Sequence, residues 1–375
     1  MTSRERLLAV MRGDIPDRVP VSTYELVGWN SRAWENHEPS YGRLMDCIRA
    51  KTDCIAMWNP SGAAEGIGGA FMSWTDSVTL SRETRAEDSR SITTTVVHTP
   101  KGDLTAVTAR DPDVHTTWTL KHFCETAEDV RKFLSISYKY APPDFSGLPR
   151  IRQEVGEHGI VMPSIADPLC HAAELFAMSD FTVFAFTEKA LFREVLDAFF
   201  PRVMDALVAM LKAGAGDMYR IVGPEYASEP YLPPRLFDEF VTPYDSRMVE
   251  LIHEHGRYAR LHCHGRLCNV LDSIAATGCD GIDPAEPPPD GDITIAEIRG
   301  RFPKLGIFGN IELKLLEHGT KDDVQRAVAA AINEGKPGGR FCLMPTAAPI
   351  NIPLARKTEE NYLAYIDTAL ELGGY

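Results

Sequence analysis

The segment Tyr258–Gly265 reads YARLHCHG and has the pattern of a short strand that ends at a glycine. Side chains two residues apart on a strand point to the same face. His262 and His264 are therefore expected to project together, with Cys263 on the opposite face. The two imidazoles would then lie where the strand ends and a loop begins.

Two imidazoles on one face indicate a metal site, because neutral imidazole is the commonest nitrogen ligand for zinc and similar ions. The alternative is a pair of histidines satisfied by hydrogen bonds within the fold. The sequence leaves both interpretations open.

Outward from Tyr258–Gly265, strands and helices alternate along most of the chain, with helices expected at 234–255 before it and 266–277 after it. Eight units of strand and helix predict an α/β fold, a (β/α)8 TIM barrel, rather than an open doubly wound sheet. A length of 375 residues fits one such domain over 1–375. The expected strands are Arg18–Thr23, Asp53–Trp58, Gly159–Ser164, Asp217–Gly223, Tyr258–His264, Asp280–Asp283, Lys304–Asn310 and Arg340–Met344.

An insertion interrupts this alternation between the second and third strands, at residues 78–120. The segment is rich in Thr, Val and Ser with a period of two, as in Ser91–Val97, and Pro100–Asp103 supplies a turn. It is predicted to form antiparallel β-hairpins. They could cover the barrel mouth or form a contact in a homo-oligomer, and the sequence does not decide between these roles.

Polar residues follow several of the predicted strands, and the functional groups of TIM barrels lie at the carboxyl ends of the strands. Asp283, Asn310 and Thr346 follow the sixth, seventh and eighth strands, and Glu225 follows the fourth. Glu225 with the two histidines would form a three-ligand metal site with an open position, as in catalytic centres. Alternatively, Glu225 caps a loop or pairs with Arg260.

Three further residues are candidates for the substrate pocket. Tyr24 and Trp58 follow the first two strands and could line an apolar pocket or belong to the core. His171 follows the third strand and would face the mouth if a helix begins there, although a capping or surface position fits equally well.

The composition limits the class of partner. The net charge of −14 argues against a nucleic-acid or anionic-membrane surface, because like charges repel. The N-terminal segment lacks the apolar run of a signal peptide, and no stretch is long enough to span a membrane. Eight scattered cysteines without a CxxC motif indicate reduced thiols. We therefore expect a cytoplasmic protein that binds a small-molecule substrate.

Four segments together resemble the uroporphyrinogen decarboxylase superfamily, and more narrowly its methyltransferase-like branch. They are Arg6–Pro20, His262–Gly265, Gly309–Ile311 and the closing helix with Glu359–Tyr362. Each motif is short, but their order and spacing match over nearly the whole chain. That branch includes enzymes that pass methyl groups from corrinoid proteins to thiols such as coenzyme M, and O-demethylases.

The resemblance implies a TIM barrel and a metal-dependent methyltransferase or demethylase that acts on a small molecule. A corrinoid protein or tetrahydrofolate would be the methyl carrier. The branch uses zinc held by a His-x-Cys pair on the fifth strand and a cysteine after the eighth. His262 matches the first ligand, whereas His264 and Thr346 stand where the family has cysteines. A His, His and Glu set is harder than a thiolate set, which leaves room for another divalent metal or another substrate.

Two other functions remain open at this point. One is a decarboxylase or lyase that acts on a non-porphyrin carboxylated substrate, which would need basic residues at the mouth. The RQAGR signature that grips porphyrin carboxylates is missing from this sequence, so a true uroporphyrinogen decarboxylase is not expected. The other is a barrel that binds a ligand without catalysis, which would hold no metal.

Overall fold

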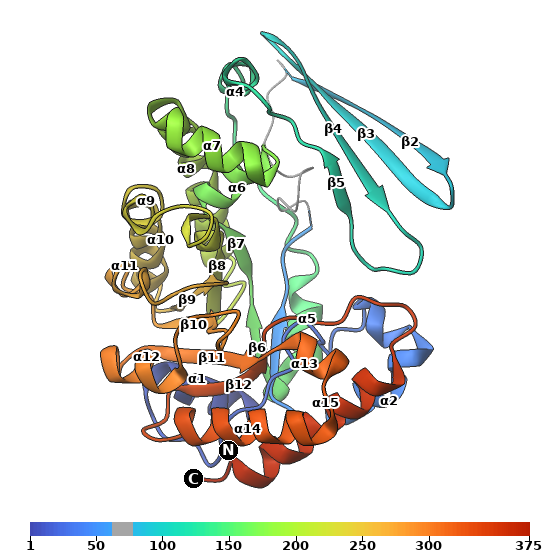
Figure 1. The fold of residues 1–375 in the computed structure, drawn as a ribbon, viewed down its shortest axis with the longest axis vertical. Coiled ribbons are helices and arrows are strands. Elements are labelled where there is room, and N and C mark those ends of the chain that lie inside the picture. The colour runs from blue at the N-terminus through green and yellow to red at the C-terminus, as the bar shows by residue number, and fades with distance from the viewer. Residues whose placement is uncertain (62–77) are drawn as a thin grey trace.

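The computed structural model describes residues 1–61 and 78–375 and shows an α/β fold built on parallel strands (Figure 1). Six strands form one parallel sheet in the order β12-β11-β10-β9-β8-β7, and β1 pairs with β6 in a second parallel sheet. The strands are β1 (Cys54–Met57), β6 (Gly159–Met162), β7 (Ser164–Ala166), β8 (Met218–Val222), β9 (Tyr258–Cys263), β10 (Gly281–Pro284), β11 (Gly306–Ile311) and β12 (Phe341–Pro345).

Backbone hydrogen bonds connect the two sheets through the segment 20–22. The Ser22 amide donates to the Leu343 carbonyl of β12 at 2.9 Å, and the Asp53 amide beside β1 donates to the Val21 carbonyl at 2.8 Å. The predicted first strand therefore lies between β12 and β1, but it forms only isolated bridges, from Val21 to Leu343 and from Arg18 to Gly374. The prediction of an α/β fold of parallel strands is confirmed, whereas the strands form two connected sheets rather than one continuous one.

The predicted third strand is divided at Pro163 into β6, which pairs with β1, and β7, which pairs with β8. Proline has no amide hydrogen to donate to a neighbouring strand, so the ladder breaks there. The Pro163 carbonyl still accepts from the Arg220 amide at 2.9 Å. The chain therefore continues in the same direction from β6 to β7, while its neighbouring strand changes from β1 to β8.

Helices follow most of the strands and surround them (Figure 1). Four begin with a capping box, in which a threonine and an acidic residue three positions later satisfy the first free amides; the four threonines are Thr2, Thr126, Thr294 and Thr320. The helices are α1 (Ser3–Arg12), α2 (Gly42–Lys51), α4 (Ala127–Leu134), α5 (Leu148–Val155), α6 (Pro168–Glu174), α7 (Met178–Thr187), α8 (Lys189–Lys212), α9 (Pro234–Phe240), α10 (Thr242–Glu254), α11 (Leu271–Ala276), α12 (Ile295–Arg301), α13 (Leu313–His318), α14 (Lys321–Gly335) and α15 (Arg356–Leu372).

Every residue of β10, β11 and β12 is buried, as expected for parallel strands covered on both faces. One apolar cluster contains Ile55, Phe308 and Met344 from the strands together with Leu7 and Val10 of α1. A second, larger cluster includes residues of the strands and of the surrounding helices. The strands therefore carry a core on each face, and polar side chains gather at their carboxyl ends.

The insertion forms a four-stranded antiparallel sheet between β1 and β6, where the sequence predicted hairpins. Its strands are β2 (Thr79–Glu87), β3 (Arg90–Thr99), β4 (Gly102–Arg110) and β5 (Trp118–Lys121). In Figure 1 this sheet stands apart from the parallel strands, at the opposite end of the molecule from the two chain termini.

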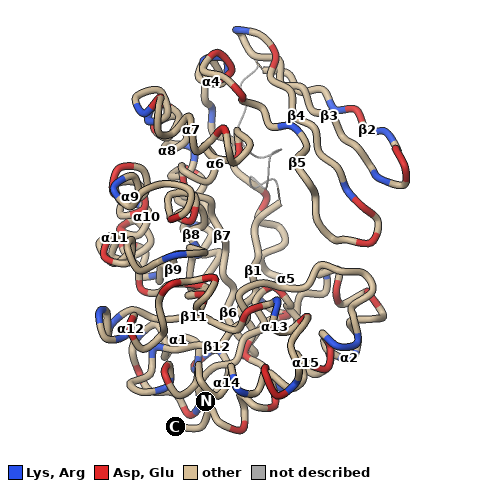
Figure 2. Tube along the Cα trace, in the orientation of Figure 1, with Lys and Arg blue, Asp and Glu red and all other residues tan. Residues whose placement is uncertain are grey.

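Acidic and basic residues are interspersed over the helices and loops rather than gathered on one element (Figure 2). Within the described ranges, no single helix is long and apolar enough to cross a membrane; the consecutive helices α6 and α7 reach that length and composition only together, with a bend of 117°.

A buried carboxylate ties the N-terminal segments to β1. Asp53 accepts from Arg6 Nη1 at 2.6 Å, from Arg18 Nη1 at 2.7 Å and from the Val21 amide at 2.8 Å. Its side chain is fully buried. Asp53 is the buried acceptor that these three donors share, although Arg6 also pairs with Asp17 and Arg18 also donates to the Val19 carbonyl.

We expect Asp53→Ala to lower the free energy of unfolding by about 3–5 kcal/mol, because Arg18 loses its acidic partner and the buried Arg6 keeps Asp17 alone as a counter-charge. Asp367→Ala is the control, since it removes an exposed ion pair with Lys51 and should leave stability nearly unchanged. Urea titration followed by circular dichroism measures both. Equal effects of the two substitutions would contradict the role given to Asp53.

Candidate functional site

The pairing of β9 with β10 places His262 directly beside Asp283. His262 Nδ1 lies 3.0 Å from Asp283 Oδ2, and both side chains are buried. An ionised carboxylate can only accept, so Nδ1 carries the proton and Nε2 keeps its lone pair. Burial lowers the pKa of His262, with a further contribution from Arg220, which favours the neutral ring.

Two buried arginines surround Asp283. Arg260 Nε lies 3.1 Å from Asp283 Oδ1, and Arg220 Nε lies 3.5 Å from Asp283 Oδ2. Burial alone would raise the pKa of Asp283, but Arg260, His262 and Arg220 together lower it well below its usual range. Asp283 is therefore an anion at neutral pH and fixes the His262 ring. Arg260, an alternative partner for Glu225 in the sequence, pairs with Asp283 instead.

His264 has a carboxylate partner of its own. Its Nδ1 lies 2.8 Å from Glu286 Oε1, and the Gly265 amide donates to Glu286 Oε2 at 2.6 Å. Burial would lower the pKa of His264, but the hydrogen bond and charge of Glu286 raise it above its usual value. The rings of His262 and His264 lie perpendicular, with centroids 4.5 Å apart. The two rings lie next to each other, as the sequence predicted.

Glu225 lies on the short 3-10 helix η4 (Pro224–Ala227), directly after β8. Its Oε2 accepts from the Gly223 amide at 3.1 Å, so the carboxylate also caps its own loop. Glu225 lines a cavity of about 580 Å³ together with His264 and Glu286. The structure thus brings Glu225 and His264 to one cavity, with His262 against His264.

The residues described in the structure contain no group of three or more His, Cys, Asp or Glu side chains placed to hold a metal ion. The two histidines nevertheless have the arrangement that metal ligands need, because a carboxylate on Nδ1 fixes the tautomer and directs Nε2 outward. No hydrogen bond to either Nε2 occurs among the described side chains. The predicted set of His262, His264 and Glu225 is thus not placed as a metal-holding group, and metal binding by these residues stays a prediction.

Three residues that were candidates for the substrate pocket lie within the fold at the strand ends. Tyr24 is buried and accepts a hydrogen bond from Arg220 Nη2 at 2.5 Å. Thr346 is buried and its Oγ1 accepts from the Leu313 amide at 3.2 Å. Asn310 is buried at the end of β11.

Two other pocket candidates lie against apolar core. Trp58 is partly buried and packs on the main core. His171 lies in α6 and stacks on Phe199 of α8, with ring centroids 5.3 Å apart. His171 faces the helical layer instead of the mouth. The helix begins at Pro168, and this start determines toward which side each residue of α6 points. The expectation that His171 faces the mouth does not match this position.

The sequence did not identify two important members of the site. Arg220 stands in the interior of β8, where a buried arginine at a strand position is itself the signal that a buried anion is near. Glu286 belongs to the proline-rich loop 283–290, in which only Asp283 was a candidate from the sequence. Cys263 and Cys342 are fully buried, and burial raises the pKa of both thiols, so both are core residues.

His171 provides a test of burial by titration. Burial and the nearby Arg202 lower the pKa of His171 from 6.5 to about 4, so the folded state disfavours the charged ring. Stability should be complete above pH 6.5 and fall by up to about 3 kcal/mol as the pH drops to 4. In His171→Phe this part of the pH dependence should vanish, as measured by urea unfolding between pH 7 and about pH 4. An unchanged pH profile in the variant would contradict the assignment.

Comparisons with known proteins identify the family of this chain. The family described as uroporphyrinogen decarboxylase (URO-D) matches residues 116–351. Uroporphyrinogen decarboxylases from Prochlorococcus marinus (strain NATL1A) and Parasynechococcus marenigrum (strain WH8102) are each 25% identical over 197 residues, which is 50% of this chain. The match spans 53% of those relatives, about half of their length.

Among solved structures, a methyltransferase from Methanosarcina mazei shares the fold over 99% of both chains, with a TM-score of 0.61 and 16% identity. The family match covers more than half of the chain and contains β6 through β12 with the histidine pair. The chain therefore belongs to the uroporphyrinogen decarboxylase (URO-D) family.

Proposed function

We propose that the protein is a small-molecule methyltransferase or demethylase of the URO-D family, in which His262, His264 and Glu225 hold a zinc ion or another divalent metal. The observation that carries this proposal is the pair of carboxylates on the two Nδ1 atoms, Asp283 on His262 and Glu286 on His264. Such partners orient histidines that bind metals. Two ring nitrogens and one carboxylate are a donor set suited to zinc, with a position left for substrate.

A divalent metal held by these residues would supply Lewis acidity, which lowers the pKa of a sulfur or oxygen atom of a bound substrate. The residues of the chain prepare the site. Arg260 and Arg220 keep Asp283 ionised, Asp283 holds the proton on His262 Nδ1, and the buried position excludes water from that ring. Glu286 fixes both the ring of His264 and the backbone of the loop that follows it.

The charge of the cavity favours this function over decarboxylation of a substrate with several carboxylates. Its lining includes Arg266 and four acidic side chains: Glu225, Glu229, Glu286 and Asp290. A polyanionic substrate would be repelled there, whereas a metal cation would be attracted. Burial and the charge of Glu286 raise the pKa of Glu312 to about 7, as expected where carboxylates crowd together.

The methyl carrier in this proposal is a corrinoid protein or tetrahydrofolate. The fold shared with the methyltransferase from Methanosarcina mazei supports methyl transfer as the class of reaction to measure. The assay follows the appearance of methylated carrier from a methylated substrate, or its reverse. Carbon dioxide release from a carboxylated substrate, without methyl transfer, would instead support the decarboxylase function.

The metal content of the purified untagged protein tests the site directly. We expect about one zinc per chain by mass spectrometry in the parent, and loss of the metal in His262→Ala and His264→Ala, because each substitution removes a nitrogen donor. His253→Ala is the control, since His253 is an exposed histidine paired with Asp280 and should leave the metal in place. A folded parent protein that stays free of metal after incubation with zinc would overturn the proposal.

The role of Glu286 gives a second, finer prediction. Glu286→Gln should weaken zinc affinity by about 10- to 100-fold, since partners of ligating histidines have effects of that size. Glu229→Gln removes the same charge from the same cavity without a contact to either histidine and should change the affinity far less. Competition with a chelator measures both dissociation constants. Equal losses would show that cavity charge, and not ring orientation, sets the affinity.

A further inference from the structure

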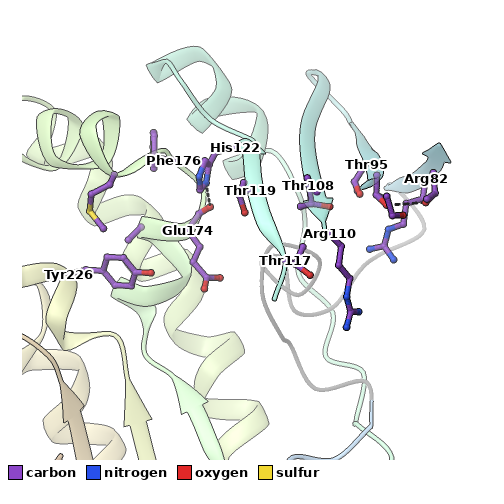
Figure 3. Close-up of a pocket in the computed structure, with 16 residues that line it drawn as sticks. Arg82, Thr95, Thr108, Arg110, Thr117, Thr119, His122, Glu174, Phe176 and Tyr226 are labelled. Atoms are coloured by element: carbon purple, nitrogen blue, oxygen red, sulfur yellow. Dashed lines mark hydrogen bonds between the residues drawn. The ribbon is translucent and has the colours of Figure 1, made fainter. Parts of the chain in front are cut away.

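A second and larger cavity, of about 810 Å³, lies between the inserted sheet and the ends of the parallel strands (Figure 3). One wall is the face of the sheet formed by β2 to β5. Across the cavity lie residues of α6 and Tyr226 of η4. No role has been given so far to this space.

The sheet wall carries a row of threonines, one from each strand. Thr84 pairs with Thr93, Thr93 with Thr108, and Thr108 with Thr119. All four line the cavity, and the hydroxyl oxygens of Thr84 and Thr93 lie 3.0 Å apart. Residues in register on neighbouring strands point to the same side, so the row presents hydroxyl groups across the full width of the sheet.

Beyond the cavity, the same face of the sheet carries apolar side chains. Val97, Leu104 and Ala106 are buried there, and β4 contacts α4. Threonine has nearly the shape of valine, so packing alone does not call for hydroxyl groups in the cavity portion. The change from apolar to hydroxyl side chains coincides with the cavity, which indicates a polar ligand.

Two arginines flank the threonine row. Arg82 lies opposite Thr95, and Arg110 lies opposite Ser91. Neither arginine has an ion-pair partner within the described parts of the chain, whereas the nearby Arg85 and Arg90 pair with acidic residues. In a chain with a net charge of −14, two arginines without an acidic partner on a hydroxyl-rich wall favour an anionic ligand.

The opposite wall combines apolar and polar groups. Phe176 is buried, and His122 Nδ1 lies 3.0 Å from the Glu174 carbonyl. The Glu174 carboxylate also lines the cavity, and burial raises its pKa, which favours the uncharged form. Tyr226 and Met178 line both this cavity and the one that contains His264. The two cavities therefore meet along these two side chains.

We propose that the threonine row with Arg82 and Arg110 binds the oxyanion end of a small organic substrate, a carboxylate or a phosphate, whose apolar part lies along Tyr226 and Met178 toward His264. The position of the reacting end rests on the proposed function, but the anion site does not. Arginine forks and threonine hydroxyls both donate to such oxyanions. In this proposal the insertion recognises the substrate, and any reaction takes place separately, at the histidines.

Ligand-observed NMR titration tests the anion site with benzoate, phenyl phosphate and uncharged benzamide as probes. At least one anionic probe should bind more tightly than benzamide. The double variant Arg82→Ala and Arg110→Ala should weaken that probe by about tenfold, and Thr93→Val should weaken it less. Arg85→Ala is the matched control, because Arg85 lies on the opposite face of β2 and pairs with Glu87.

The preferred probe identifies the anion: tighter binding of phenyl phosphate indicates a phosphate ligand, and tighter binding of benzoate a carboxylate. Absence of binding by both, equal binding of benzamide, or an unchanged affinity in the double variant would overturn the proposal. Metal content measured on the same variants should stay at the parental value. Failure of anion binding with the metal retained would refute the anion site alone, and the reverse result would refute only the metal site.

Discussion

The buried ion cluster around Asp283 is the constraint on which the site depends. Arg220, Arg260 and His262 reach this carboxylate from two neighbouring strands, all within a region from which water is largely excluded. Each charge is expensive to bury alone and is tolerated only because the others are present. The register of β8, β9 and β10 and the orientation of one histidine are therefore settled by the same set of contacts.

The two cavities divide the tasks of a binding site by charge. The cavity at the histidines is mainly acidic, which suits a cation, whereas the wall formed by the insertion carries a row of hydroxyl groups and two arginines that lack an ion-pair partner among the described residues. Opposite potentials in two cavities that share Tyr226 and Met178 would orient a polar ligand before it makes close contacts. In the binding mode proposed above, the anionic end of the ligand lies toward the sheet and its other end lies near Tyr226 and the histidines.

Much of the fold follows from periodicity, since buried parallel strands read as short apolar runs and the insertion as alternating Thr and Val. The adjacency of His262 and His264 follows for the same reason, because it depends only on local strand geometry. The break at Pro163 and the direction of His171 were missed, since both depend on which neighbour a segment meets. The threonine row could not be predicted either, because Thr84, Thr93, Thr108 and Thr119 align only once the register of four strands is known.

The place where the insertion leaves the parallel strands has a consequence for how the protein can diversify. The insertion begins after β1 and returns before β6, and these two strands pair directly with each other. None of the paired residues of β1 and β6 belongs to the inserted sheet, so the length or sequence of that sheet can change without disturbing this pairing. With the roles proposed above, ligand preference is separable from the histidine site. Exchange of the inserted sheet alone would then be a route to new substrates on an unaltered set of parallel strands.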